Sequence, residues 1–404
     1  MSNKLFKSSF SYTILQSFVG QSSYTLLSIF LTFIIARFFG PEILGRYSYI
    51  TTFLLFLSVF IKAGMDNSIM FFIPQKGPNY ISFCFFIAFI LFVIIGGASF
   101  LIIMDQDLSN FLFLSFILAS QDIFFGIYKA NGQIKEYFLL KTTIVICLQI
   151  VLVVIGYNLL LRSLFFLLLV FAIPNTLLVL ILVIKNSSKF QEIIFGKDFI
   201  KYSIPMMFTA MLGLLMNRID ILMLGNMVNM TELGVYRVVV QISSFSALIL
   251  GIFNIAFAPK IAKLYSQNKI TELVEIYSKS TRVLCILGSC VLLVIFFFNK
   301  SLLQIFGDEY IYATKTLLLV SLGQFFVISV GSVGFMLTMI AKPHLQLYRI
   351  IMAASSNIIL NYFLINKYGI NGAATASMIA LFISSFVGYL FLKRVLQIKV
   401  FKFF

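Results

Sequence analysis

Twelve apolar runs, each long enough or nearly long enough to cross a bilayer, decide what this chain can fold into. A helix needs roughly 20 apolar residues to span the hydrocarbon. Seven uncharged runs reach that length, and five shorter runs do so if one or two internal charges are tolerated. The runs are apolar on all sides rather than alternating, so they predict helices and not barrel strands. The predicted spans are residues 8–36, 47–73, 77–104, 111–128, 142–161, 163–184, 202–225, 238–259, 283–299, 316–341, 350–366 and 368–392.

The composition excludes a soluble protein. Of the 404 residues, 61% are hydrophobic and only 11% are charged. A soluble surface needs about a quarter charged residues. The connections between the predicted spans are short, and the longest, residues 260–282, has the pattern of an interfacial helix. The predicted fold class is therefore an all-α polytopic membrane protein with twelve transmembrane helices.

The positive charge indicates an orientation rather than a nucleic-acid partner. The formal net charge is +16, from 30 basic and 14 acidic residues. With a cytoplasmic N-terminus and alternating spans, 21 of the 30 basic residues fall on the inner side and seven on the outer side. Basic residues accumulate on the cytoplasmic side of membrane proteins. We therefore expect both termini in the cytoplasm.

A short motif indicates that the two halves of the chain are related. Leu-Gly-x-Tyr follows the first span at residues 44–47 and the seventh span at residues 233–236. Each half has six spans, so both halves enter the membrane from the same side. This predicts a parallel repeat about an axis along the membrane normal. We expect two six-helix lobes, residues 1–190 and 191–404, related by a pseudo-two-fold axis and separated by a central cleft.

Nothing in the sequence predicts a metal site or a cofactor. His344 is the sole histidine, and the four cysteines are scattered within predicted spans. No Gly-x4-Gly-Lys-Ser/Thr loop is present, so ATP is not expected to be the direct energy source. A proton or sodium gradient acting through Asp66 or Asp220 is the coupling that we expect, and the sequence does not choose between the two ions.

Residues 36–47, Ala-Arg-Phe-Phe-Gly-Pro-Glu-Ile-Leu-Gly-Arg-Tyr, resemble the first outer loop of a known family. It is the polysaccharide transporter family, the O-antigen and lipid-linked oligosaccharide flippases of the multidrug/oligosaccharidyl-lipid/polysaccharide exporter superfamily. Three further segments resemble this family. They are residues 62–66, residues 220–225 with Asp220 ahead of Leu224 and Gly225, and residues 369–374. The resemblance covers the whole chain in span number, length and repeat.

This resemblance implies a flippase of the bacterial cytoplasmic (inner) membrane. Its substrate would be an oligosaccharide linked to undecaprenyl pyrophosphate, which two lobes move to the periplasmic leaflet by alternating access for O-antigen, lipopolysaccharide or another surface polysaccharide. The implied partners are this lipid-linked glycan, membrane lipids, a polysaccharide polymerase and a chain-length regulator. Relatives that flip lipid II carry several arginines in their first two spans. This chain has none inside its first span, which argues against a lipid II substrate.

Five charged residues fall inside predicted spans, where each costs about 2.5–3.5 kcal/mol at a helix centre: Lys62, Asp66, Asp122, Arg218 and Asp220. Lys62 and Asp66 are four residues apart, so on a continuous helix they share one face, which Asn67 borders. Two interpretations of this pair stay open. Lys62 meets the substrate when Asp66 releases it, or the two residues form a neutral pair that only locks the helix.

The other three charges carry separate hypotheses. Arg218 and Asp220 are two residues apart and point to different sides of a helix, so each needs a partner elsewhere, which favours a role in the cleft or gate. Asp122 lies near the inner end of the fourth span, and a structural pair with Lys129 at the interface is the preferred interpretation there.

Polar residues within the spans are further candidates. A stripe on the first span, which includes Gln21, contacts either the sugar or a neighbouring helix. Arg37 lies at the outer end of that span and either closes an outer gate or snorkels to lipid headgroups. Gln241 and Gln324 are weaker candidates for the cavity.

Two other classes of protein compete with the flippase. A cation-coupled multidrug or metabolite antiporter of the same superfamily would have the same spans and lobes, with a more apolar cavity. A membrane glycosyltransferase or polymerase would need large outer loops for its catalytic residues, and here the outer connections are turns. We therefore expect a transporter and not an enzyme.

Overall fold

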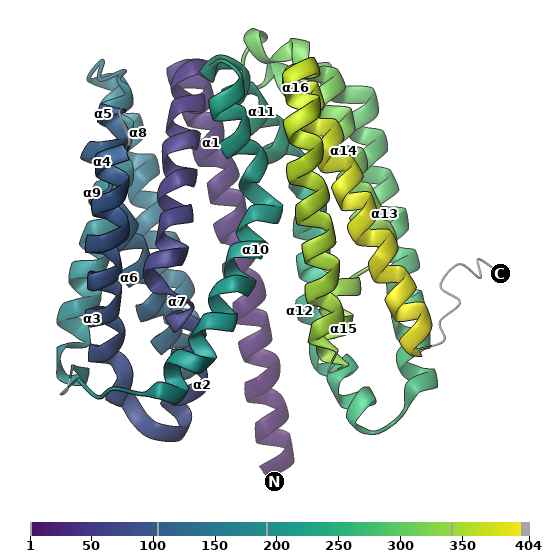
Figure 1. Ribbon diagram of the computed structural model, residues 1–404. Helices are drawn as coiled ribbons and strands as arrows, with labels where there is room; N and C mark the ends of the chain where they lie inside the picture. Colours follow the sequence, from purple (N-terminus) through teal and green to yellow (C-terminus); the bar gives the residue numbers. More distant parts are fainter. Residues whose placement is uncertain (1, 103–104, 191–192, 341, 397–404) are drawn as a thin grey trace. The chain divides into compact units, whose positions relative to one another are not determined.

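The computed structural model describes residues 2–102, 105–190, 193–340 and 342–396. These residues are almost entirely helical and contain no strand (Figure 1). The helices are α1 (Ser2–Lys62), α2 (Met65–Lys76), α3 (Ile81–Leu91), α4 (Gly97–Ile102), α5 (Gln106–Asn110), α6 (Phe113–Ala130), α7 (Ile134–Leu139), α8 (Leu148–Asn158), α9 (Leu164–Lys185), α10 (Lys197–Met227), α11 (Met230–Ser243), α12 (Phe245–Ser266), α13 (Ile270–Gln304), α14 (Thr314–Ser329), α15 (Val333–Met339) and α16 (Pro343–Leu396).

The predicted all-α fold with many membrane-spanning helices is confirmed. Ten helical segments of the described residues are long and apolar enough to cross a membrane. Two of them, Val19–Lys62 and Pro343–Leu396, are 44 and 54 residues long. The first overlaps the two predicted spans 8–36 and 47–73, and the second contains the predicted spans 350–366 and 368–392. Gly40 (φ 78°) and Gly369 (φ 52°) divide these two segments. Both glycines adopt the left-handed backbone that other residues disfavour, so the chain reverses there without a loop.

Two compact units make up the chain. The first unit comprises Met1–Phe39 and Arg46–Leu214, and the second comprises Gly40–Gly45 and Leu215–Phe404. Helix α10 therefore begins in the first unit and ends in the second. The predicted lobes, residues 1–190 and 191–404, are parts of the chain that would move as bodies during transport. This division stays a prediction.

Helix α6 is the central helix of the first unit. It packs against α2, α3 and α9, and 67% of its spanning window is buried, more than in any other of the ten segments. It is also the least apolar of these segments, with a mean hydropathy of 1.2. Its protein-facing position explains how a polar side chain such as Asp122 is tolerated within a span.

In the second unit, α14 packs against both α13 and α16 (Figure 1). Helices α14 and α15 form one span that is interrupted at Gly331, which has a φ of 73°. The predicted interfacial helix within residues 260–282 is wrong as a separate element. Its first part extends α12 to Ser266, and its second part is continuous with the spanning helix α13.

The glycines of the two Leu-Gly-x-Tyr motifs, Gly45 and Gly234, take part in a close backbone contact within the second unit. A Cβ atom on Gly45 would overlap the carbonyl oxygen of Met230, and one on Gly234 would overlap the carbonyl oxygen of Pro41. Met230 precedes Gly234 by four residues, and Pro41 precedes Gly45 by four residues. Each glycine thus contacts the equivalent carbonyl of the other motif. This reciprocal contact is what a two-fold relation between the repeats produces.

Candidate functional site

The second predicted span is broken in its middle, next to its charged residues. Helix α1 ends at Lys62 and α2 begins at Met65. Between them, Ala63 (φ 46°) and Gly64 (φ 74°) adopt left-handed backbone. This conformation is strained for an alanine. Broken helices at membrane depth are tolerated where protein surrounds them or where they line a cavity, and in transporters they mark binding sites.

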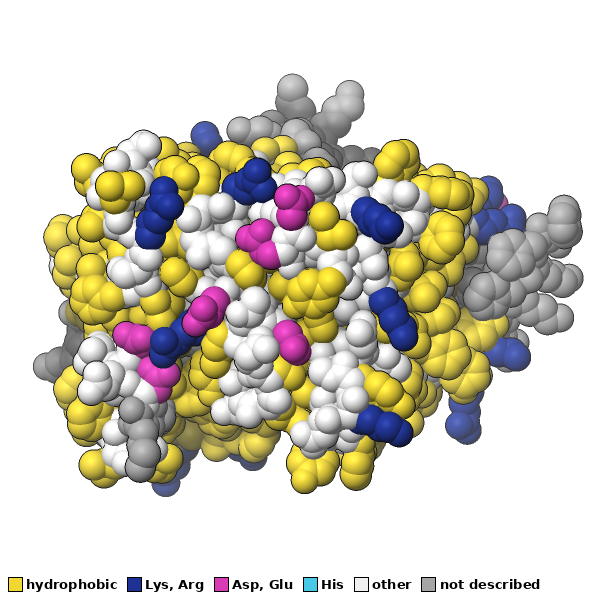
Figure 2. All heavy atoms as spheres, turned by 90° about the horizontal axis from the view of Figure 1, so that it is seen from above, with side chains coloured by type: hydrophobic (Ala, Val, Ile, Leu, Met, Phe, Trp, Pro, Cys, Tyr) yellow, Lys and Arg dark blue, Asp and Glu magenta, His cyan; other side chains and the backbone are white. Residues whose placement is uncertain are grey.

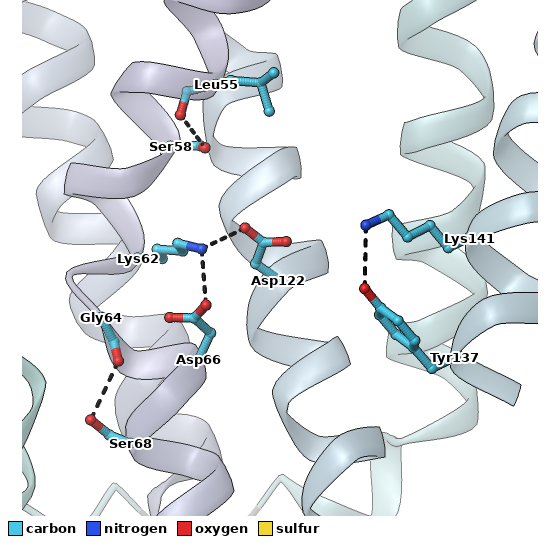
Figure 3. Close-up of polar contacts among 9 residues, drawn as sticks. All are labelled: Leu55, Ser58, Lys62, Gly64, Asp66, Ser68, Asp122, Tyr137 and Lys141. Carbon is cyan, nitrogen blue, oxygen red and sulfur yellow. Dashed lines mark hydrogen bonds and ion pairs between the residues drawn. The ribbon is translucent and has the colours of Figure 1, made fainter. Parts of the chain in front are cut away.

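Lys62 forms two ion pairs at this break (Figure 3). Its Nζ atom lies 2.9 Å from Asp66 Oδ2 and 2.6 Å from Asp122 Oδ2. Lys62 ends α1 and Asp66 lies in the first turn of α2, so both charges also match the helix dipoles. The predicted contact between Lys62 and Asp66 is confirmed. The reason given for it is wrong, because the two residues belong to different helices rather than to one face of a continuous helix.

Asp122 belongs to this cluster and not to a pair with Lys129. Its carboxylate contacts Lys62, whereas the Lys129 ammonium lies 4.8 Å from the centre of the Tyr137 ring. The interfacial Asp122–Lys129 pair is therefore a wrong prediction. The side chain of Asp122 is 43% exposed, although that of Lys62 is only 8% exposed. The cluster thus has a closed side at Lys62 and an open side at Asp122.

A second cation faces the open side. Lys141 extends toward Asp122 from the π-helical segment η3 (Leu140–Cys147), as Figure 3 shows. Its Nζ atom donates a hydrogen bond to Tyr137 Oη at 3.2 Å and lies 4.5 Å from the centre of the Tyr24 ring. The cluster of Lys62, Asp66, Asp122 and Lys141 is electrically neutral when all four groups are charged. One oxygen, Asp66 Oδ1, is buried without a hydrogen-bond partner in the described residues.

Close backbone contacts hold the break in place. A Cβ on Gly64 would overlap the carbonyl of Ser203 in α10, so α10 touches the break itself. Ser68 and Ser203 then share a hydrogen bond of 2.7 Å. On the α6 side, a Cβ on Gly126 would lie 2.5 Å from the carbonyl oxygen of Asp66. The break is therefore packed on both sides within the first unit.

The second unit holds a different polar pair. Asp220 of α10 is buried and accepts a hydrogen bond of 2.5 Å from the hydroxyl of Tyr236 in α11. Ser377 of α16 lies 3.5 Å from the same hydroxyl. The prediction that Asp220 needs a partner outside its own helix is confirmed, and the partner is a tyrosine of the neighbouring helix. Arg218 is half-buried two residues away.

Arg349 directly precedes the predicted span at residues 350–366, so it is one of the 21 basic residues expected on the inner side. It lies instead among helices of the second unit, where its Nε atom donates to Gln346 Oε1 at 2.9 Å and its Nη1 atom donates to Ser384 Oγ at 2.6 Å. A row of polar residues in the sequence could have revealed this position of Arg349. Gln346, Arg349, Asn357 and Asn361 recur at helical spacing along α16, and both asparagines are buried.

The remaining candidates lie apart from these two clusters. Gln21 and Arg37 are exposed, Asn67 and Gln324 are half-buried, and Gln241 is buried in α11. Ser17 belongs to the same polar stripe on the first predicted span as Gln21, and its side chain lies outside the part that the structure describes. Tyr137, Lys141 and Tyr236 are further residues that sequence reasoning missed, since no local spacing links them to the charges that they contact.

The predicted outer face carries charges of both signs (Figure 2). Arg46 lies 3.5 Å from both Asp105 and Asp107, and all three side chains are 30–41% exposed. Pairs this exposed contribute little to stability. In the described part of the chain, no group of three or more His, Cys, Asp or Glu residues is placed to hold a metal ion.

The comparisons with known proteins agree with this architecture. Residues 205–363 match the MatE family. The chain has a TM-score of 0.72 to an inward-facing multidrug resistance MATE family transporter of the MOP superfamily, at 14% identity over 93% of this chain and 94% of the other. The family match covers less than half of the chain. The fold of the chain is the two-lobe helical fold of these transporters, and its helices are those of a multi-pass membrane protein.

Two further relatives concern cell-envelope glycans. The chain is 25% identical over 411 aligned residues to the capsular polysaccharide biosynthesis protein CapF of Staphylococcus aureus, covering 94% of this chain and 98% of CapF. The lipid II flippase MurJ, in an inward closed conformation, has a TM-score of 0.72 at 16% identity, covering 94% of this chain and 87% of MurJ. At this identity, the likeness to MurJ concerns the fold.

Proposed function

We propose that this protein is a MatE/MOP-type transporter, namely a flippase for undecaprenyl-pyrophosphate-linked oligosaccharides in surface polysaccharide biosynthesis. The observation that carries the proposal is the similarity to CapF, which extends over 94% of the chain. The shared fold with a lipid II flippase supports the same substrate class. The transporter takes the lipid-linked glycan from the cytoplasmic leaflet of the bacterial membrane and releases it in the outer leaflet.

Alternating access is the proposed mechanism. The two lobes, residues 1–190 and 191–404, move against each other while both termini stay in the cytoplasm. The glycan then passes to a polysaccharide polymerase whose products a chain-length regulator limits. O-antigen is one class of product, and a capsule is the class that the CapF similarity favours.

The Lys62 cluster is the proposed coupling element in the first unit. Lys62 is held by two carboxylates that come from different helices, α2 and α6. Protonation of Asp122, or sodium binding at the free Asp66 Oδ1 atom, weakens the ion pairs that hold Lys62. The backbone at Ala63 and Gly64 is then able to change conformation. Asp220 with Tyr236 is the second candidate for a proton or sodium ion.

A cation-coupled multidrug or metabolite antiporter is the second candidate function. The match of residues 205–363 to MatE and the likeness to multidrug transporters favour it. This function would need a cavity that accepts apolar cations.

Deletion of the gene in a strain that makes the polysaccharide tests the proposal. We expect surface glycan to disappear and lipid-linked repeat units to accumulate in the inner leaflet, with rescue by the wild-type gene. Ethidium accumulation in the same strains tests the antiporter. Unchanged surface glycan together with increased ethidium retention would replace the flippase with the antiporter. A reporter fused within residues 185–201 tests the orientation, because these residues should be cytoplasmic.

A further inference from the structure

Arg349 places a guanidinium in the second unit with neutral groups as its contacts. The acceptors of its hydrogen bonds are the Gln346 amide oxygen at 2.9 Å and the Ser384 hydroxyl at 2.6 Å. The ion pairs found among the described residues do not involve Arg349. A charged residue within a membrane span is costly and normally pairs with an opposite charge. The positive charge of Arg349 therefore lacks a partner that this part of the chain supplies.

The side chain also runs away from the membrane edge. Arg349 lies six residues after Pro343, where α16 begins, which is about 9 Å along the helix. Ser384 lies near the middle of the second half of α16, between the kink at Gly369 and the end at Leu396. Long basic side chains near a helix end normally extend toward water. This one extends toward the membrane interior, so snorkelling does not explain its position.

The surrounding helices leave room for the guanidinium. A Cβ on Gly334 of α15 would lie 2.6 Å from Arg349 Nη2, and one on Gly388 of α16 would lie 2.8 Å from Arg349 Cδ. A further polar group lies beside Ser384 in the same helix. The hydroxyl of Ser385 is buried and has no hydrogen-bond partner in the described residues. The glycines at these two positions thus make room for the half-buried side chain of Arg349.

We propose that Arg349 binds the diphosphate of the lipid-linked substrate. This inference rests on the proposed flippase function and assigns its anion-binding residue. Lys62 is less suited to this role because two carboxylates already neutralise it and would repel a second anion. Arg349 faces no such competition, and a guanidinium matches phosphate oxygens with two parallel hydrogen bonds. A diphosphate supplies the counter-charge that the second unit lacks.

Binding to the purified full-length protein in detergent tests this assignment. The probes are farnesyl diphosphate, farnesol and inorganic pyrophosphate, and the readouts are the dissociation constant and the shift of the melting temperature. We expect farnesyl diphosphate to stabilise the wild type and farnesol to have no comparable effect. Arg349→Gln should weaken farnesyl diphosphate binding about tenfold to a hundredfold, the range for a lost charge-assisted hydrogen bond. Arg349→Lys should retain part of the affinity.

The matched control is Arg394→Gln, which removes the same charge from an exposed position on the same helix. It should leave binding unchanged. If Arg349→Gln does not fold, Ser384→Ala and Arg349→Lys test the same contact and should each weaken binding. Equal affinity in wild type and Arg349→Gln, an equal shift with farnesol, or an equal loss in Arg394→Gln would each overturn the assignment. If inorganic pyrophosphate bound as tightly as farnesyl diphosphate, the inference that the substrate is linked to a lipid would be overturned.

The same variants separate this assignment from the flippase proposal. Diphosphate binding through Arg349 in a protein whose deletion leaves surface glycan intact would overturn the flippase and keep an anion site. Full glycan export by Arg349→Gln, with unchanged binding, would overturn the anion site and keep the flippase.

Discussion

Lys62 in the first unit and Arg349 in the second are both basic side chains inside membrane-spanning segments, but their partners differ in kind. Lys62 is 8% exposed and bonded to two carboxylates. Arg349 is bonded to an amide and a hydroxyl. A cation in an ion pair stabilises its partners, so removing it leaves buried negative charge behind. A cation without a carboxylate stabilises little, and for this reason we assign a ligand to Arg349 and not to Lys62.

Removal of the Lys62 charge should have the largest effect on stability. Lys62→Met leaves Asp66 and Asp122 facing each other without a cation, which costs about 3–5 kcal/mol in comparable buried pairs. The free energy of unfolding, measured by titration of the detergent-solubilised protein with SDS, reports this loss. Additional Asp66→Asn and Asp122→Asn substitutions should restore most of the stability.

Lys129→Met is the control for Lys62→Met. Lys129 lies in the same unit and contacts the Tyr137 ring rather than a carboxylate. Loss of a partly exposed cation–π contact costs about 0.5–1 kcal/mol. An equal loss for the two variants would show that the ion pairs at the helix break do not hold the first unit together.

Loss of the Tyr236 hydroxyl should have the next largest effect. Tyr236→Phe removes the donor to buried Asp220, and a hydrogen bond to a charged group contributes about 1.5–3 kcal/mol. Asp220→Asn keeps an acceptor for the same hydroxyl and should cost less. Thermal unfolding of the two purified variants distinguishes these outcomes. An Asp220→Asn variant that is less stable than Tyr236→Phe would mean that Asp220 has a stronger partner than Tyr236.

The backbone contact at Gly45 and Gly234 allows a test of a feature that the two halves of the chain share. Gly45→Ala and Gly234→Ala each force a methyl group against a backbone carbonyl, and overpacking of this kind costs about 1–3 kcal/mol. The two losses should be equal, because each glycine contacts the equivalent residue of the other repeat. Gly251→Ala, where no atom lies within 4 Å, is the neutral control in a helix. Unequal losses in thermal unfolding would contradict the two-fold relation at this contact.

The spans and the repeat were predictable from the sequence for a physical reason. A bilayer requires about 20 apolar residues per helix, so length and hydropathy alone locate the spans. The two kinks also follow from residues that can be read directly, Gly40 and Gly369. The Leu-Gly-x-Tyr motif indicated the repeat because close helix contact requires glycine at the same place in each half.

The candidate site was only partly predictable. Lys62 and Asp66 are close in sequence, so their contact was found, but the break at Ala63 and Gly64 is not visible in hydropathy. Asp122 is 60 residues from Lys62, and local spacing wrongly favoured Lys129 as its partner. Arg349 was assigned to the inner rim because it directly precedes the predicted start of a span at residue 350. Only packing against Ser384, 35 residues later, shows that its side chain turns inward.

Arg349→Met should have the smallest effect on stability and a large effect on transport. Removal of the guanidinium breaks hydrogen bonds to Gln346 and Ser384 but also removes an uncompensated charge from a membrane span. These contributions oppose each other, so the free energy of unfolding should change by about 1 kcal/mol or less. Surface glycan should nevertheless disappear in cells that express this variant at wild-type levels. A stability loss as large as that of Lys62→Met would mean that a carboxylate holds Arg349 in the native protein. The difference between the two cations would then be one of degree, and the unpaired charge would no longer indicate a ligand.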